Sequence, residues 1–411
     1  MKLHSDRDRA VINIAGFLRS FGVGLMGVVL GIYLSRLGFS SLTIGIIIAI
    51  GLAGAASATV MVSFFADRFG RKRSLLLLSL FTAVGGLALA FSPALPWLLV
   101  LVFVSMLNGT GTERSPSYAL EQAVIPGLVP DSRRTWSLAL YNVLIDGGGS
   151  LGALCAGVPL ILHNWLGFPL LSAYKFVFLG YAALYLATAG LCLLLSPAIE
   201  IASPPALLTA ANRIAPETKK VVTRLTALFS LDAFGGGFLT DALVSYWFFH
   251  RFGIAERELG VVFFVVHVLN AFSHLGAAWL ARRIGLLNTM IFTHLPSSIF
   301  LMAVPFATSF KWAAILFFCR EALVEMDVPT RQSYVAALVK PAERTFTSGV
   351  TNLARNVFWA VGSATAGVAM QVFGFSTPLF IGGGAKIAYD ALLYKSFRQL
   401  KPPEETARPR E

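Results

Sequence analysis

Charged side chains inside long apolar runs are the residues of this sequence that are best suited to do chemistry. Asp146 comes directly before three consecutive glycines, and Glu113 and Arg114 lie just ahead of a proline. A carboxylate in a poorly hydrated space holds its proton at a higher pH than one in water, so it can load and release protons as its access to water changes. We therefore expect Asp146 and Glu113 to be the leading proton sites. The alternative is that Arg19 or Arg114 neutralises the carboxylate, which then never titrates.

Two charges of opposite sign occupy matching positions in the sequence. Arg19 lies in the middle of the first apolar run, and Asp232 lies at the corresponding place in the seventh. Charges inside a membrane are costly and are retained where they face a partner or a water-filled passage. We expect Arg19 and Asp232 to form an ion pair across such a passage or to contact a solute separately. The alternative is a structural role in which each one locks its helix within its own bundle.

Further polar side chains recur at helical spacing in the later apolar runs. His267, Asn270 and His274 are three and four residues apart, so they share one helix face, and Glu321 and Glu325 share another. For the first face, packed and hydrogen-bonded histidines are the alternative to a solute, proton or metal contact. The full set of residues expected along the passage is Arg19, Glu113, Arg114, Asp146, Asp232, Asp241, His267, Asn270, Glu321, Glu325 and Arg355.

Two charges in the same apolar run as Glu321 are not expected to line the passage. We expect Asp327 and Arg331 to be solvated near the cytoplasmic end of their span.

The elements that carry these residues follow from composition. Hydrophobic residues make up 56% of the 411 residues, charged residues only 13%, and the mean hydropathy is +0.72, so most of the chain cannot face water. Apolar runs long enough to cross a bilayer as helices recur along the chain. We predict an all-α integral membrane protein without a removable signal peptide, and we expect its three cysteines to be small buried hydrophobes. The twelve expected spans are 10–34, 41–65, 74–92, 96–120, 136–161, 172–195, 221–249, 258–281, 286–308, 311–338, 345–373 and 377–395.

The distribution of basic residues predicts the orientation of the chain. The net charge is +12, and Lys and Arg crowd the segments that are cytoplasmic if the N-terminus lies inside. Few lie in or beside the opposite segments, namely Arg36, Lys175, Arg251, Arg257 and Lys311. We therefore expect a multi-pass protein of the inner or plasma membrane with both termini in the cytoplasm.

A duplicated six-helix unit explains the middle of the sequence. A proline-rich polar stretch separates six expected spans from six more, and several residues of the first half recur in the second at an offset of about 210 residues, such as Gln122 with Gln332 and Asn142 with Asn352. We predict two pseudo-symmetric six-helix bundles, with the domains 1–196 (N-terminal bundle), 197–220 (cytoplasmic linker), 221–395 (C-terminal bundle) and 396–411 (cytoplasmic tail). Such duplicated units, joined at an interface near mid-membrane, are typical of transporters.

A dense charge cluster between the second and third spans carries a family resemblance. The residues Ala66, Asp67, Arg68, Gly70, Arg71 and Lys72 match the loop signature Gly-x-Leu-Ala-Asp-Arg-x-Gly-Arg-Lys, although Ser63 and Phe65 stand where the signature has Gly and Leu. The chain thereby resembles the major facilitator superfamily, and in particular its drug-exporter-like bacterial permeases. The resemblance implies a conformational latch formed by Asp67, Arg68, Gly70, Arg71 and Lys72. The alternative for the basic residues is that they only enforce topology.

The same resemblance implies a secondary active transporter that works by alternating access. The fifth span is glycine-rich, with Gly148, Gly149, Gly152 and Gly157, but it has Ala153 where the antiporter signature has proline. Proton-coupled efflux of a small molecule is the expected function, with proton-coupled uptake of a polar or charged solute as the alternative and a transporter-derived sensor as a distant one.

The expected partners and cofactors are few. We expect a small-molecule substrate, protons and membrane lipid as partners, no nucleic acid, and a monomer. No cofactor and no metal is expected, and the sequence has neither a His-Glu-x-x-His motif nor a phosphate-binding loop, so we expect no enzyme.

Overall fold

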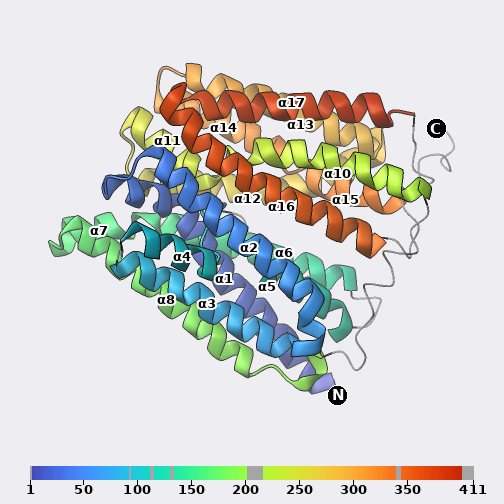
Figure 1. Ribbon diagram of the computed structural model, residues 1–411, viewed down its shortest axis with the longest axis horizontal. Helices are drawn as coiled ribbons and strands as arrows, with labels where there is room; N and C mark the ends of the chain where they lie inside the picture. Colours follow the sequence, from blue (N-terminus) through green and yellow to red (C-terminus); the bar gives the residue numbers. More distant parts are fainter. Residues whose placement is uncertain are drawn as a thin grey trace. The chain divides into compact units, whose positions relative to one another are not determined.

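A computed structural model of the protein describes residues 2–91, 94–111, 115–129, 134–200, 216–338 and 344–399 (Figure 1). Within these ranges the chain forms helices joined by short turns, and no strand occurs there, as the composition predicts. The α-helices are α1 (Lys2–Arg36), α2 (Ser41–Phe69), α3 (Arg71–Phe91), α4 (Leu95–Ser105), α5 (Pro116–Val124), α6 (Arg134–Leu154), α7 (Val158–Leu166), α8 (Leu170–Leu193), α10 (Pro216–Gly237), α11 (Asp241–Phe252), α12 (Glu256–Ile284), α13 (Leu286–Ala303), α14 (Phe310–Val324), α15 (Asp327–Leu338), α16 (Arg344–Val372) and α17 (Thr377–Phe397). Short 3-10 turns are η1 (Ile125–Leu128), η3 (Cys155–Gly157), η4 (Pro197–Ile199) and η5 (Val304–Phe306).

Eight stretches of the described chain are long and apolar enough to cross a membrane: Asp6–Arg36, Ser41–Val62, Arg71–Phe91, Leu140–Leu166, Leu170–Leu193, Thr218–Phe252, Glu256–Ala281 and Leu286–Phe306. Large apolar side chains are exposed on the protein surface, among them Trp97, Trp165 and Phe373. A soluble protein would rarely leave so many uncovered, whereas lipid covers them in a membrane. The prediction of a multi-pass helical membrane protein is confirmed.

Three predicted spans are interrupted by non-helical residues, and a fourth, 136–161, changes from α6 through the 3-10 turn η3 to α7. The stretch 96–120 is divided between α4 and α5, 221–249 between α10 and α11, and 311–338 between α14 and α15. Backbone preferences explain two of these interruptions: Gly111 has a positive φ of 74° between α4 and α5, and three glycines end α10. The last two predicted spans are formed by α16 and α17, which are long enough to cross but more polar than the eight.

The described residues group into two compact units. Unit 1 comprises Met1–Pro205 with Thr240–His267, and unit 2 comprises Ala206–Leu239 with Val268–Glu411. The helix α11 and the start of α12 therefore pack with the first unit. Most of the expected linker, residues 201–215, lies outside the described residues.

Glycines allow two helices to pack backbone to backbone in each unit. In unit 1, an added Cβ at Gly148 or Gly152 of α6 would overlap a carbonyl oxygen of α1. In unit 2, an added Cβ at Gly362 of α16 would overlap the Phe234 carbonyl oxygen of α10. Because Gly152 and Gly362 are 210 residues apart, these two close contacts are the same contact in the two copies of the repeat.

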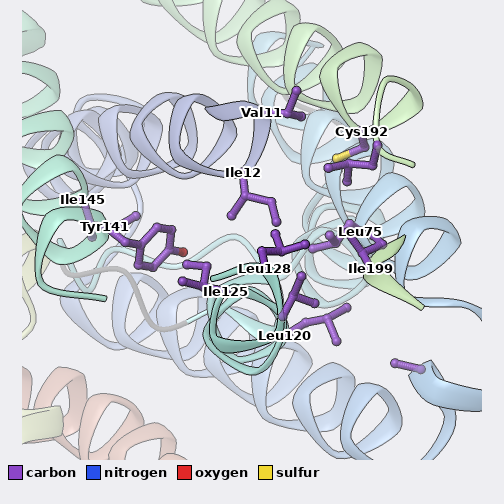
Figure 2. Close-up of a cluster of buried hydrophobic side chains, with 13 residues drawn as sticks. Val11, Ile12, Leu75, Leu120, Ile125, Leu128, Tyr141, Ile145, Cys192 and Ile199 are labelled. Carbon is purple, nitrogen blue, oxygen red and sulfur yellow. The ribbon is translucent and has the colours of Figure 1, made fainter. Parts of the chain in front are cut away.

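A buried apolar cluster joins several helices of unit 1. Figure 2 shows side chains from α1, α3, α5, α6 and α8 that meet there. The buried members include Val11, Ile12, Leu75, Leu120, Ile125, Leu128, Tyr141, Ile145, Cys192 and Ile199. Cys192 is buried as predicted, but Cys155 is only partly buried and Cys319 is exposed on α14. Outward-facing residues of a membrane helix meet lipid, so an apolar run does not imply burial within the protein.

Candidate functional site

A buried ion pair joins α1 to α5 in unit 1. The Arg19 guanidinium donates to both carboxylate oxygens of Glu121, from Nη1 to Oε1 at 2.8 Å and from Nη2 to Oε2 at 2.7 Å. Arg19 is 3% exposed and Glu121 is 1% exposed. The Tyr141 hydroxyl of α6 donates to the same carboxylate. This bidentate pair therefore ties three helices together in the interior of the unit.

Unit 2 holds a larger buried network centred on Asp232 of α10. The Lys386 ammonium of α17 lies 2.8 Å from Asp232 Oδ1, and Asp232 Oδ2 accepts from Arg331 of α15 at 3.2 Å and from Arg355 of α16 at 3.1 Å. Arg331 also donates to Asp327 at 2.7 Å. One carboxylate thus binds cations from three helices. The formal charges of the two aspartates, the two arginines and the lysine sum to +1.

His294 of α13 extends this network to a third carboxylate. Its Nδ1 lies 3.0 Å from Asp390 Oδ1 and 3.1 Å from Asp390 Oδ2, and its Nε2 lies 3.3 Å from the Lys386 ammonium. All three side chains are buried. With Asp390 ionised, the three aspartates and three cations of the network have a net formal charge of zero.

The buried pairs of the two units are related by the repeat but have opposite polarity. Glu121 and Arg331 are separated by the same 210 residues as other matched positions, and Arg19 corresponds to Asp232. Unit 1 therefore places the cation on the first helix of the repeat and the anion on the fourth, whereas unit 2 places the anion on the first and the cation on the fourth.

The pairing of Arg19 with Asp232 across a passage stays a prediction. Within its own unit each of the two charges has buried partners, as in the structural alternative that the sequence left open. The prediction that Asp327 and Arg331 are solvated is wrong. They are 3% and 7% exposed, because they lie on the face of α15 that packs toward Asp232.

Other predicted residues fall into smaller groups. In unit 1, His267 Nε2 lies 3.7 Å from Asp241 Oδ2, so these two are brought together. A Cβ at Gly111 would overlap the Asp241 carboxylate, and the loop before α5 can approach α11 so closely only with glycine there. In unit 2, Glu321 pairs with its neighbour Arg320.

The remaining predicted residues are more dispersed. Asn270 is buried on α12, and its Oδ1 has no hydrogen-bond partner within the described part of the chain. Asp146 on α6 and Glu325 at the end of α14 are half-buried. Glu113, a leading proton candidate, and its neighbour Arg114 lie outside the described residues.

The predicted latch segment is anchored to the end of α8 within unit 1. Gly70 has a φ of 107° and ends α2, and the carboxylate of Glu200 accepts from the backbone amides of Arg71 at 2.7 Å and Lys72 at 3.2 Å. The Lys72 ammonium donates to the backbone carbonyl oxygens of Leu193, the last residue of α8, and of Leu195. Arg68 is exposed, and the side chain of Asp67 lies outside the described residues. A carboxylate at a helix N-terminus is favourable because it binds the unpaired amides.

Sequence reasoning missed His294, Lys386 and Asp390 as members of the site. A signal was present, since each is a polar residue within an apolar run, and Lys386 and Asp390 are four residues apart on one face of α17. No short motif surrounds them, so only the fold reveals that α13 and α17 meet at Asp232.

A metal ion is poorly suited to the unit 2 network. Asp232, His294 and Asp327 each offer a ligand atom within 4.8 Å of the others. Their carboxylates, however, already bind Lys386 and Arg331, and a divalent cation would add charge beside those cations.

One sequence pattern suggests a nucleophile but is explained by the helix. Residues 148–152 match Gly-x-Ser-x-Gly, in which the serine of a hydrolase stands on a sharp turn. Here Ser150 lies in the middle of α6, and its hydroxyl donates to the Asp146 carbonyl oxygen of the preceding turn at 2.8 Å. This serine is therefore an ordinary helical residue.

Comparisons with known proteins agree with this architecture. A family model described as Major Facilitator Superfamily matches residues 12–363 and 225–411. An uncharacterized membrane protein of Saccharomyces cerevisiae, YJR124C, is 28% identical over 394 residues, which cover 89% of this chain and 88% of the relative. A D-xylose transporter of Levilactobacillus brevis is 26% identical over 137 residues, covering 33% of this chain and 28% of the relative.

Solved structures share the fold. A variant of the nucleoside transporter NupG superposes with a TM-score of 0.76 at 14% identity, covering 95% of this chain and 99% of that chain. A D-xylose-proton symporter superposes with a TM-score of 0.72 at 16% identity, covering 95% and 98%. These named proteins are transporters and not enzymes. Because the family model spans most of the sequence, this multi-pass membrane protein belongs to the Major Facilitator Superfamily, as a secondary transporter.

Proposed function

We propose that the protein moves a small polar organic solute across the membrane by alternating access and uses a proton gradient to do so. The unit 2 network is the observation that carries this proposal. Three cations, three carboxylates and a histidine are buried there in helices of a membrane protein. Burying such groups is expensive unless they are paired, and groups that can gain or lose a proton offer a means of coupling.

The class of solute is suggested by chemistry and by the names of similar proteins. An apolar solute gains nothing from charged and hydrogen-bonding side chains, whereas a hydroxylated or zwitterionic solute can bind them. The similar proteins are named as carriers of a nucleoside, D-xylose and inositol. We propose that sugars, polyols and nucleosides are the first solutes to test.

The direction of transport has two candidates. Proton-coupled export is the direction that the sequence resemblance favours. The close glycine contacts between α6 and α1 are no further evidence for export. The same contact recurs between α16 and α10 in unit 2, so it is a property of the repeat. Uptake by symport is the second candidate, because a structure with the same fold is named as a D-xylose-proton symporter.

The cytoplasmic latch is part of the proposal. Arg71 and Lys72 are held at the start of α3 by Glu200, and this fixed position would present Asp67 and Arg68 at the end of α2. We expect Asp67→Asn to insert and fold normally and to slow turnover, with Arg73→Gln, an exposed basic residue outside the predicted latch, as the neighbouring control. Unchanged turnover in Asp67→Asn would argue against the latch.

The proposal also covers orientation. The basic residues favour cytoplasmic termini, and a monomer embedded in lipid suffices for alternating access between duplicated bundles. Cysteine-accessibility labelling of residue 5 and of residue 405 in spheroplasts should give reaction only after the cells are opened.

Transport in proteoliposomes tests the main proposal. A thermal-shift screen of the purified chain against pentoses, hexoses, inositol, nucleosides and amino acids at pH 5.5 and 8 first identifies a bound solute, because a ligand stabilises the folded state by mass action. Radiolabelled solute is then followed with an acidic exterior or an acidic interior. Uphill movement that stops with a protonophore supports proton coupling, and its sign separates export from uptake. Solute that only equilibrates under both gradients would refute the coupling.

A coupling carboxylate can be tested in the same vesicles. Asp146→Asn tests the proton site that the sequence predicts: if Asp146 takes part in coupling, accumulation driven by a gradient is lost while exchange across the membrane persists. If accumulation persists, Asp146 does not carry the coupling proton.

A further inference from the structure

His294 is enclosed by charged groups from each helix that packs on it in unit 2. Its side chain is 1% exposed, and α17 presents both an anion and a cation to the two nitrogens of the ring. The ring of Tyr389, also on α17, meets the imidazole edge to face at 5.8 Å. The other titratable or charged groups around it are Asp232 on α10, Arg320 on α14, and Asp327 and Arg331 on α15, while Arg355 on α16 reaches it through Asp232.

The partners of the ring determine which nitrogen carries the proton. A Lys386 ammonium has hydrogens to donate and no lone pair, so at 3.3 Å it can only donate to an unprotonated Nε2. A neutral imidazole with a bare Nε2 carries its hydrogen on Nδ1, and Nδ1 faces both oxygens of Asp390 at 3.0 and 3.1 Å. The resting state is therefore a neutral His294 in the Nδ1–H form, donating to the Asp390 carboxyl group.

With Asp390 ionised and His294 neutral, the three aspartates offset Lys386, Arg331 and Arg355, so the formal charges of the network sum to zero. An additional proton on the ring would have to sit on Nε2, the nitrogen that Lys386 occupies. The proton and the ammonium thus compete for one lone pair.

We propose that Nε2 of His294 is the atom that takes up the coupling proton of this transporter, in competition with the hydrogen bond from Lys386. The inference rests on the proposed proton coupling and assigns it to one atom. A proton from water adds to Nε2 and makes an imidazolium, and Lys386 gives up that contact while keeping Asp232 Oδ1 at 2.8 Å. Release reverses the step: the proton leaves to water, and Nε2 again accepts from Lys386.

The exchange changes how three helices are joined. In the neutral state Lys386 and Asp390, one turn apart on α17, hold both nitrogens of a single ring on α13. Protonation places two cations side by side, so one of these two contacts between α13 and α17 is lost. His294 Nε2 also lies 3.7 Å from Asp232 Oδ1, and the new N–H can turn toward that carboxylate on α10. Proton binding therefore moves an attachment of α13 from α17 to α10.

Nitrogen-15 NMR of the purified full-length chain tests the assignment without any solute. The chain has six histidines, so the signals of His294 are assigned by their loss in His294→Gln. In the wild type we expect the Nδ1–H form at pH 8 and conversion to the doubly protonated ring as the pH is lowered. Lys386→Met removes the competing ammonium, and the conversion should then occur at a pH higher by about one unit or more.

Lys386→Met should remain folded because Asp232 retains Arg331 and Arg355. Lys386→Arg keeps the charge and should titrate like the wild type, and Lys395→Met, on an exposed part of the same helix, is the matched control that should change nothing. An Nε2–H form in the neutral wild type would overturn the inference. So would a ring that stays neutral across the titration of folded protein, or a Lys386→Met variant that titrates like the wild type.

Transport separates failure of the inference from failure of the proposed function. His294→Gln should keep solute exchange and lose accumulation driven by a proton gradient. If the wild type accumulates solute with protons and His294→Gln does so equally, the inference fails and the proposed function stands. If the NMR result holds but protons never drive the wild type, the coupling fails and the titration of His294 stands as a property of the fold alone.

Discussion

The buried pair of Arg19 and Glu121 allows a quantitative test of how unit 1 is held together. Arg19→Met leaves the Glu121 carboxylate in the interior, with the Tyr141 hydroxyl as its remaining hydrogen-bond donor among the bonds described. Removing one partner of a buried pair costs about 3–5 kcal/mol, because the other charge stays desolvated. Removing both costs little, since similar-sized apolar side chains can fill the space. The double variant Arg19→Met/Glu121→Met should therefore be markedly more stable than either single variant.

Thermal unfolding in detergent measures this difference. The chain has seven tryptophans, whose fluorescence reports unfolding. At about 2–4 °C per kcal/mol for a unit of this size, each single variant should lose on the order of 10 °C, and the double variant should recover most of it. The pair of Arg9 and Asp6, whose side chains are 32% and 70% exposed, is the matched control, and its cycle should give under about 1 kcal/mol. If the double variant loses as much stability as the two single variants lose together, the two charges do not compensate each other and the reasoning is wrong.

Three further predictions concern other contacts. Gly152→Ala should reduce the yield of folded, monodisperse protein in size-exclusion chromatography, because its methyl group overlaps a carbonyl oxygen of α1, whereas Gly180→Ala has open space and should behave as the wild type. Glu200→Ala removes the carboxylate that binds the first amides of α3 and should lower stability by about 1 kcal/mol, seen as a fall of a few degrees in the unfolding midpoint, and no fall would contradict a capping role. Arg36→Met should lower the midpoint by several degrees, since it leaves Glu256 buried with a tyrosine hydroxyl as its other described partner, and a second change, Glu256→Gln, should restore it.

Much of the fold could be predicted from sequence because its causes are local. Runs of about 20 apolar residues lead to membrane helices whatever their neighbours are, and the duplicated residues reveal the repeat without structure. The interruptions of the predicted spans were harder to predict from the sequence, because a single glycine such as Gly111 is tolerated in many membrane helices. Here it matters because Asp241 approaches from another helix.

The partners of the charges could not be predicted. Arg19 could be recognised as buried and costly, but its pairing with Glu121 depends on which faces of α1 and α5 meet. His294 and Lys386 were not singled out, because neither forms a motif with residues near it in sequence. Their significance comes from α13 and α17 packing beside α10, which is a property of the tertiary structure.

The opposite polarity of the two repeat-related pairs restricts how the copies could have diverged. If both copies began with the same arrangement, changing Arg19 or its counterpart alone would have set two like charges against each other in the interior, at the separation of the present 2.7 Å contact. An evolutionary intermediate with uncharged side chains at both positions avoids that barrier, because an apolar pair of similar volume is tolerated. Grafting the first helix of one copy into the other should likewise fail unless the fourth helix travels with it.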